Sequence, residues 1–177
     1  MKRLFPHLLL ILSVVGLDQA TKALLVRSIE LHDSVPLVDG WLSLSRVHNR
    51  GAAFGLLSDW DLPQQPWLLS LLSIAALIAI AVYFVRLPAT ARLPRFALAL
   101  VLGGAIGNLI DRVRLGYVVD FIRAYWRQHQ WPDFNLADSA ITIGVTLLVF
   151  DILRSPAPTL PSGQSVETAG ETAGRID

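Results

Sequence analysis

The stretch Phe96-Ala-Leu-Ala-Leu-Val-Leu-Gly-Gly-Ala-Ile-Gly-Asn-Leu-Ile-Asp-Arg-Val113 decides the fold class of this chain. It is apolar almost throughout, and about 20 such residues are enough to cross a bilayer as a helix. Three further apolar runs of similar length flank it, at about residues 8–26, 67–85 and 136–153. A transmembrane barrel would instead show many short alternating strands. The sequence therefore predicts an integral membrane protein with four transmembrane helices.

The composition supports this class and excludes others. Hydrophobic residues make up 53% of the 177 residues and charged residues only 16%, too few to cover the surface of a soluble protein of this size. There is no cysteine, which excludes disulfides, thiolate catalysis and cysteine metal sites. A net charge of +1 without a basic block gives no indication of nucleic-acid binding. We expect no cofactor, no metal and no nucleic-acid partner.

The start of the chain also fits a cleaved secretory signal, because Met1-Lys2-Arg3 precedes an apolar run. Asp18, Gln19 and Lys22 interrupt that run where a small-residue cleavage site would be expected, which favours a transmembrane helix. We expect one four-helix domain over residues 1–154. Residues 155–177 are rich in Pro, Ser, Thr and Gly without an apolar period, which predicts a disordered tail.

The expected orientation follows from tryptophan rather than from basic residues. Four spans put both termini on one side, but Lys and Arg occur on both sides, so their count does not decide the orientation. All five tryptophans lie on the side away from the termini: Trp41, Trp60, Trp67, Trp126 and Trp131. Because tryptophan gathers at membrane–water interfaces, we expect cytoplasmic termini, a cytoplasmic tail and tryptophan-rich loops outside.

Two of the outer loops carry a pattern of their own. Residues 35–47 alternate apolar and polar side chains around Asp39-Gly40, which predicts a hairpin and a small sheet on the membrane face. Residues 121–131 show apolar side chains at helical spacing and are followed by Pro132, which predicts a short amphipathic helix. The predicted fold is thus an all-α membrane protein with a small extracytoplasmic β-hairpin and one short outer helix.

Polar side chains interrupt the apolar runs. Asp18 and Lys22 are four residues apart on one helix face, where they can simply neutralise each other. The third run carries three polar residues on one face and two glycines spaced for close helix packing: Asn108, Asp111 and Arg112, with Gly103 and Gly107. Together these groups predict a polar interior shared by several helices near one membrane face.

Two aspartates, Asp120 and Asp138, stand where apolar sequence meets polar sequence. Each has a structural explanation, because Asn135-Leu-Ala-Asp138 fits a helix cap and Asp120 can cap a short helix beginning at Phe121. Apolar residues precede Asp120, however, and Pro132 with its loop breaks any continuous helix between the two aspartates. The chain can therefore reverse and bring the two carboxylates together.

A carboxylate pair in contact can do aspartic-protease chemistry. Two such groups share one proton, so the ionised member can take a proton from water while the protonated member polarises a carbonyl. Three asparagines are candidates to orient a substrate backbone or to hydrogen-bond the pair: Asn49, Asn108 and Asn135. Membrane-embedded acids of this kind call for a functional or structural reason in any case.

Five blocks of the sequence resemble those of the lipoprotein signal peptidases, the signal peptidase II family. In chain order they are Asp18-Gln-Ala-Thr-Lys22, Asn49-Arg-Gly-Ala-Ala-Phe54, Gly103-Gly-Ala-Ile-Gly-Asn108-Leu-Ile-Asp111-Arg112, Val118-Val-Asp120-Phe121 and Phe134-Asn135-Leu-Ala-Asp138. A single block would be a weak signal, but five in the order of the family form a specific one. The resemblance spans residues 18–138, with no departure at the matched positions.

The resemblance implies an aspartic endopeptidase of the bacterial cytoplasmic membrane, with its active site near the outer face, and we expect it to be a monomer. It would remove signal peptides from prolipoproteins, cutting before a cysteine that carries a diacylglyceryl group. The expected partners are therefore these diacylglyceryl-prolipoproteins and membrane lipid. The matched positions imply a catalytic pair, Asp120 and Asp138. They also imply polar residues around the substrate, Asn49, Asn108, Arg112 and Asn135, and residues that mainly hold the fold, Asp18, Lys22 and Asp111.

Two other classes of protein stay open on the residues alone. A small transporter or proton-relay protein also carries acids within its spans, although the chain shows no internal repeat of the kind transporters have. A structural subunit would use the same polar residues only to fix helix packing. Other proteolytic readings lack their motifs, because neither His-Glu-x-x-His nor Gly-x-Ser-x-Gly occurs.

Overall fold

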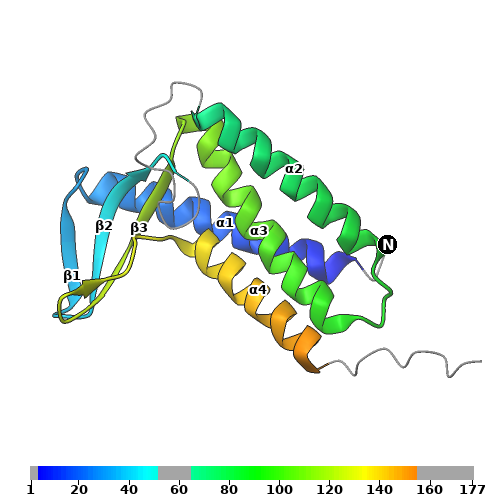
Figure 1. Cartoon of the computed structure of the whole chain (residues 1–177). Coiled ribbons are helices and arrows are strands. Elements are labelled where there is room, and N and C mark those ends of the chain that lie inside the picture. Colours follow the sequence, from blue (N-terminus) through cyan, green and yellow to red (C-terminus); the bar gives the residue numbers. More distant parts are fainter. Residues whose placement is uncertain (1–3, 52–64, 155–177) are drawn as a thin grey trace, which may run out of the picture.

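The computed structural model describes residues 4–51 and 65–154. Four helices and four strands lie within these ranges (Figure 1): α1 Phe5–Ser28, β1 Ser34–Val38, β2 Leu42–Asn49, α2 Gln65–Arg86, α3 Arg92–Leu115, β3 Val118–Trp126, β4 His129–Gln130 and α4 Leu136–Arg154. The expected disordered tail at residues 155–177, Trp60, and Ala52 to Phe54 of the second block lie outside the described residues.

The prediction of four transmembrane helices is confirmed, since α1, α2, α3 and α4 are each long and apolar enough to cross a membrane. The chain is a multi-pass membrane protein. In its most apolar window, α3 buries 56% of its residues, against 17% for each of the other three helices. Figure 1 shows α3 between its neighbours, with the sheet at one end of the bundle and the α2–α3 connection at the other. The apolar side chains exposed on the outer helices therefore face lipid.

Glycines allow the neighbours of α3 to approach it closely, as the spacing of Gly103 and Gly107 predicts. A Cβ at Gly103 would lie 2.8 Å from the Val14 Cβ of α1, and one at Gly107 would lie 2.7 Å from the Asp18 carboxylate. Gly104 meets α4 instead, because a Cβ there would collide with the Ala137 carbonyl oxygen. Close backbone approach of this kind provides the van der Waals packing that drives helix association in lipid.

The four strands form one antiparallel sheet in the order β1-β2-β3-β4. The hairpin predicted around Asp39-Gly40 is confirmed, with Gly40 at a φ of +79° in the turn. The amphipathic helix predicted for residues 121–131 is wrong. That segment lies in β3, which pairs along β2 and then turns back through Arg127 into β4. Helical spacing and strand pairing compete here, and β3 pairs the backbone groups along one edge of β2 that a surface helix at residues 121–131 would leave unpaired.

A buried ion cluster joins α1 to α3. The Lys22 ammonium lies 2.8 Å from an Asp18 carboxylate oxygen and 2.9 Å from one of Asp111, and all three side chains are at most 5% exposed. Gln19 completes the cluster by donating to the second Asp111 oxygen at 2.9 Å. Each charge thus contacts one of opposite sign, and because one cation balances only one of the two carboxylates, hydrogen bonds such as that from Gln19 stabilise the remaining negative charge in the apolar bundle.

The same carboxylates hold two backbone segments. Asp18 accepts a hydrogen bond from the Ala137 N–H in the first turn of α4, at 3.0 Å. Asp111 accepts one from the Val119 N–H in β3, at 3.1 Å. An acidic side chain at a helix N-terminus also interacts favourably with the helix dipole. The cluster therefore ties together α1, α3, the start of α4 and the start of β3.

Replacing Gly104 by Ala tests the close packing of α3 on α4. The added Cβ meets a backbone oxygen that cannot move aside, so we expect a net loss of stability, because overpacking costs about 1–3 kcal/mol. Gly16→Ala is the matched control, since a Cβ at Gly16 has no neighbour within 4 Å and alanine is intrinsically the better helix former by about 1 kcal/mol. Thermal unfolding in detergent should rank Gly104→Ala below wild type and Gly16→Ala at or above it. Equal midpoints for the two variants would contradict the packing argument.

Replacing Lys22 by Met tests the ion cluster. The change leaves two buried carboxylates without their cation, and breaking a buried pair in this way costs about 3–5 kcal/mol. We expect a large drop in the unfolding midpoint of Lys22→Met and a small one in Arg27→Met, which removes an exposed positive charge from the same helix. Similar midpoints for the two variants would mean that the cluster does not hold the fold.

Candidate active site

The fold brings Asp120 and Asp138 to one place from two different elements. Asp120 lies on β3 in register with Val47 of β2, and Asp138 lies in the first turn of α4. Asn135 connects them, because its Nδ2 donates to Asp120 Oδ1 at 2.7 Å and its backbone N–H donates to Asp138 Oδ2 at 3.3 Å. The chain reversal that the sequence predicts after β3 therefore occurs, and the two carboxylates share a hydrogen-bond partner.

The cap predicted at Asn135-Leu-Ala-Asp138 is also present. The Asp138 N–H donates to Asn135 Oδ1 at 3.0 Å, while the Asp138 carboxylate accepts the Asn135 N–H, which makes a reciprocal capping box. The cap predicted for Asp120 is wrong, since no helix begins at Phe121. Capping and site membership are thus compatible for Asp138, because the cap fixes the side chain while one of its oxygens faces Asn108.

Three asparagine amides donate to the carboxylate pair. Besides Asn135, Asn49 Nδ2 donates to Asp120 Oδ2 at 2.9 Å, and Asn108 Nδ2 donates to Asp138 Oδ1 at 2.8 Å. All three belong to the set singled out from the sequence. Each carboxylate is therefore held from two sides, and its rotamer is fixed before any substrate arrives.

The orientation of the Asn108 amide is fixed by two donors to its oxygen. Its Oδ1 accepts hydrogen bonds from Lys22 Nζ at 3.1 Å and from Asn135 Nδ2 at 3.2 Å. With two donors on the oxygen, only the amide nitrogen can face Asp138. The ion cluster of α1 and α3 thus connects to the carboxylate pair through a single side chain.

Asp120 is 2% exposed, and its surroundings shift its proton affinity. Burial, followed by the nearby charge of Asp138, raises the pKa of Asp120 to about 7. The hydrogen bonds from Asn49 and Asn135 and the charge of Lys22 act the other way and lower the pKa. A carboxyl that keeps a proton near neutral pH, beside a second carboxyl, is the arrangement that general acid–base chemistry needs.

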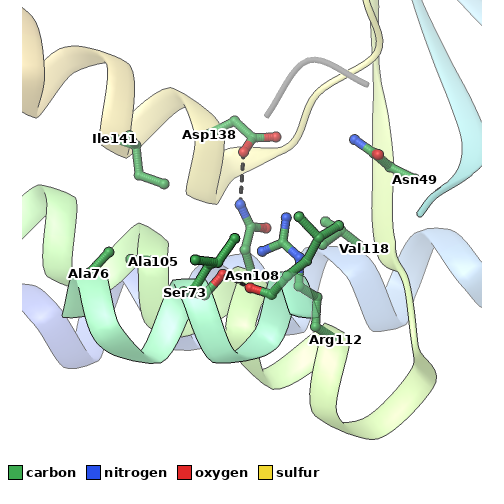
Figure 2. Close-up of a pocket in the computed structure, with 11 residues that line it drawn as sticks. Asn49, Ser73, Ala76, Ala105, Asn108, Arg112, Val118, Asp138 and Ile141 are labelled. Atoms are coloured by element: carbon green, nitrogen blue, oxygen red, sulfur yellow. Dashed lines mark hydrogen bonds between the residues drawn. The ribbon is translucent and has the colours of Figure 1, made fainter. Parts of the chain in front are cut away.

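A cavity of about 330 Å³ opens beside the pair, between α2, α3 and α4. Figure 2 shows Asn49, Arg112 and Asp138 around it, with apolar walls from Ala76 and Ile141. Asp138 lines the cavity, whereas the buried Asp120 is not among the residues that line it. Arg112 donates to the Gly51 carbonyl at 3.4 Å, which links α3 to the end of β2. An extended, mostly apolar peptide fits these walls, and the polar groups at one end can orient its backbone.

Some residues of the site carry no signal in the sequence. The apolar lining comes from side chains that look like ordinary lipid-facing or packing positions: Leu69, Leu72, Ala76, Ala105 and Ile141. Gln19 is a second case, because its place beside Asp18 in the first block is the only hint of its bond to Asp111. Among residues 4–51 and 65–154, no group of three or more His, Cys, Asp or Glu side chains is placed to hold a metal ion.

Comparison with known proteins adds independent support. The sequence profile described as "Signal peptidase (SPase) II" matches residues 10–154. A lipoprotein signal peptidase of Geobacter metallireducens is 48% identical over 138 residues, covering 78% of this chain and 84% of the relative. One of Geobacter sulfurreducens is 47% identical over 151 residues, covering 85% and 93%.

A solved structure of a bacterial membrane enzyme shares the fold. It superimposes with a TM-score of 0.75 at 32% sequence identity, over 85% of this chain and 94% of that one. A second solved bacterial membrane enzyme gives the same TM-score at 33% identity. Sequence profile, relatives and fold agree, and this chain belongs to the signal peptidase II family.

Proposed function

We propose that this chain is an aspartic endopeptidase that removes signal peptides from lipoprotein precursors, with Asp120 and Asp138 as its catalytic pair. The observation that carries the proposal is the Asn135 side chain and backbone hydrogen-bonded to both carboxylates, beside a cavity that Asp138 lines. Family membership supports the same reaction. A proton relay or transporter, the alternative open on the sequence, finds no support among the relatives.

In this mechanism the pair shares one proton. Asp120, whose pKa burial raises to about 7, holds the proton and polarises the scissile carbonyl. Asp138, on the cavity wall, takes a proton from the attacking water. The tetrahedral intermediate then collapses as Asp138 passes the proton it took from water to the leaving amine nitrogen and Asp120 retains its own proton, so the pair returns to its starting state. The asparagine amides keep both carboxylates oriented through the exchange, and Arg112 and Asn49 orient the substrate backbone.

The proposed substrate is a precursor whose cysteine, just after the scissile bond, carries a diacylglyceryl group. A second apolar cavity, of about 290 Å³, lies on the other side of Asp138 and is lined in part by Phe134, Thr142 and Ile143. Since Asp138 lines both cavities, a substrate can extend on both sides of the bond to be cut. The apolar walls suit a signal peptide that is itself embedded in the membrane, and lipid attached to the cysteine.

We further propose that the chain is a monomer in the bacterial cytoplasmic membrane, with cytoplasmic termini and the active site near the outer face. Exposed tryptophans surround the sheet end of the bundle, as expected at a membrane–water interface: Trp41, Trp67, Trp126 and Trp131.

The catalytic pair is tested by Asp120→Asn and Asp138→Asn. Asparagine keeps the shape but cannot exchange the proton, so each change should lower the cleavage rate at least about a hundredfold, the usual contribution of general acid–base catalysis. Cleavage of a diacylglyceryl-modified prolipoprotein can be followed by gel shift. Asp39→Asn is the matched control, because Asp39 lies exposed in the β1–β2 turn and should leave cleavage unchanged. Substantial activity in either site variant, with folding intact, rules out the aspartic mechanism.

The pH dependence of kcat/KM tests the protonation state. The mechanism needs one protonated carboxyl, and Asp120 loses its proton as the pH rises through its raised pKa of about 7. We therefore expect kcat/KM to fall on the alkaline side with a midpoint near that value, since this parameter reports the free enzyme. An unshifted carboxyl would already be ionised near pH 4. A profile that is flat between about pH 6 and pH 9 would contradict the assignment of the proton to Asp120.

A further inference from the structure

Another cavity, separate from the two beside Asp138, lies at the end of the bundle opposite the sheet. It measures about 650 Å³ and is lined by His7 of α1, Ala89 and Thr90 of the α2–α3 connection, and Arg92 and Arg95 of α3. None of these lining residues is acidic. Asp151, the acidic residue of α4 toward this end, does not line the cavity. Its walls therefore carry positive charge and hydrogen-bond donors, which suit an anion.

Arg95 is the central group of this cavity. It is only 8% exposed, its Nη2 donates to the Leu87 carbonyl at 2.6 Å, and its guanidinium lies 5.5 Å from the Phe84 ring centroid. Its Nε has no hydrogen-bond partner within the described part of the chain. A buried guanidinium whose Nε has no acceptor among the described residues is a group that an anion would stabilise.

His7 reinforces the same wall. Its ring packs edge-on against Phe84 with centroids 5.6 Å apart, so Phe84 contacts both His7 and Arg95. His7 Nδ1 is buried and, among residues 4–51 and 65–154, has no hydrogen-bond partner. Among the described residues, these two buried nitrogen atoms beside one cavity thus have no hydrogen-bond partner. Buried polar atoms are normally hydrogen-bonded, so this pair indicates an acceptor that the described protein residues do not provide.

The position of the cavity indicates which anion is available. α2 ends at Arg86 and α3 begins at Arg92, so the cavity lies at the ends of two membrane spans, at the depth of lipid headgroups. The start of α3 also lacks a side-chain cap, which leaves its positive dipole end toward the same region. Basic pockets between helices at this depth are known to bind phospholipid headgroups.

We propose that this cavity binds the phosphate of an anionic phospholipid headgroup, with Arg95 and His7 at its wall and Arg92 at its rim. The site is separate from the carboxylate pair and does not depend on the proposed peptidase reaction. Arg92 is exposed, so it can be replaced without disturbing the core, whereas a change at buried Arg95 also removes its contact with Leu87.

Native mass spectrometry of the full chain in detergent tests the proposal with three ligands: phosphatidylglycerol, phosphatidylcholine of the same acyl chains, and soluble glycerol phosphate. We expect tighter binding of phosphatidylglycerol than of either other ligand. Arg92→Gln should weaken it about fivefold, since a basic residue near the surface contributes roughly 1 kcal/mol. Arg86→Gln is the matched control, because Arg86 is exposed at the same end but does not line the cavity. Both variants should retain cleavage activity, which shows that they are folded.

Several outcomes would overturn the site. Equal losses in Arg92→Gln and Arg86→Gln would mean that diffuse surface charge, rather than the cavity, attracts the lipid. Equal binding of phosphatidylglycerol and phosphatidylcholine would mean that the cavity does not select an anionic headgroup. Glycerol phosphate that binds as tightly as phosphatidylglycerol would make a free phosphate the ligand, because the acyl chains would then contribute nothing.

Discussion

The structure depends on one constraint: a charge cannot be buried in an apolar bundle unless it is paired. Lys22 meets this constraint by lying between Asp18 and Asp111, at 2.8 Å and 2.9 Å. The same two carboxylates also accept backbone N–H groups from α4 and β3. The elements that carry the candidate catalytic residues are therefore positioned by the same atoms that neutralise the buried cation.

The carboxylate pair continues this network rather than standing apart from it. Asn108 links the ion cluster to the carboxylate pair. Lys22 and Asn135 donate to its side-chain oxygen, so its amide nitrogen faces Asp138. Asn135 is hydrogen-bonded to both carboxylates. Each amide has one possible orientation, and each carboxylate has one rotamer that satisfies its donors. Preorganisation of this kind means that little has to move when charge develops during a reaction.

Most of the fold follows from patterns within about 20 residues. The apolar runs, the turn at Asp39-Gly40 and the capping box at Asn135 are local, and the structure contains all of them. Residues 121–131 are the exception. Their helical spacing is real, but β3 pairs with β2, which lies more than 70 positions earlier in the chain. No local pattern reports the presence of that partner, and for this reason the predicted helix is wrong.

The sequence by itself determined the membrane class, the four spans, the hairpin and the set of polar residues that gather at one end. It did so because hydrophobicity, turn chemistry and block order are properties of the chain alone. Only the tertiary structure decided that Asn135 bridges Asp120 and Asp138, that Lys22 orients Asn108, and that apolar side chains such as Ile141 line the cavity. These relations join residues from different helices and strands, and hydrogen-bond distances between them exist only once the chain has folded.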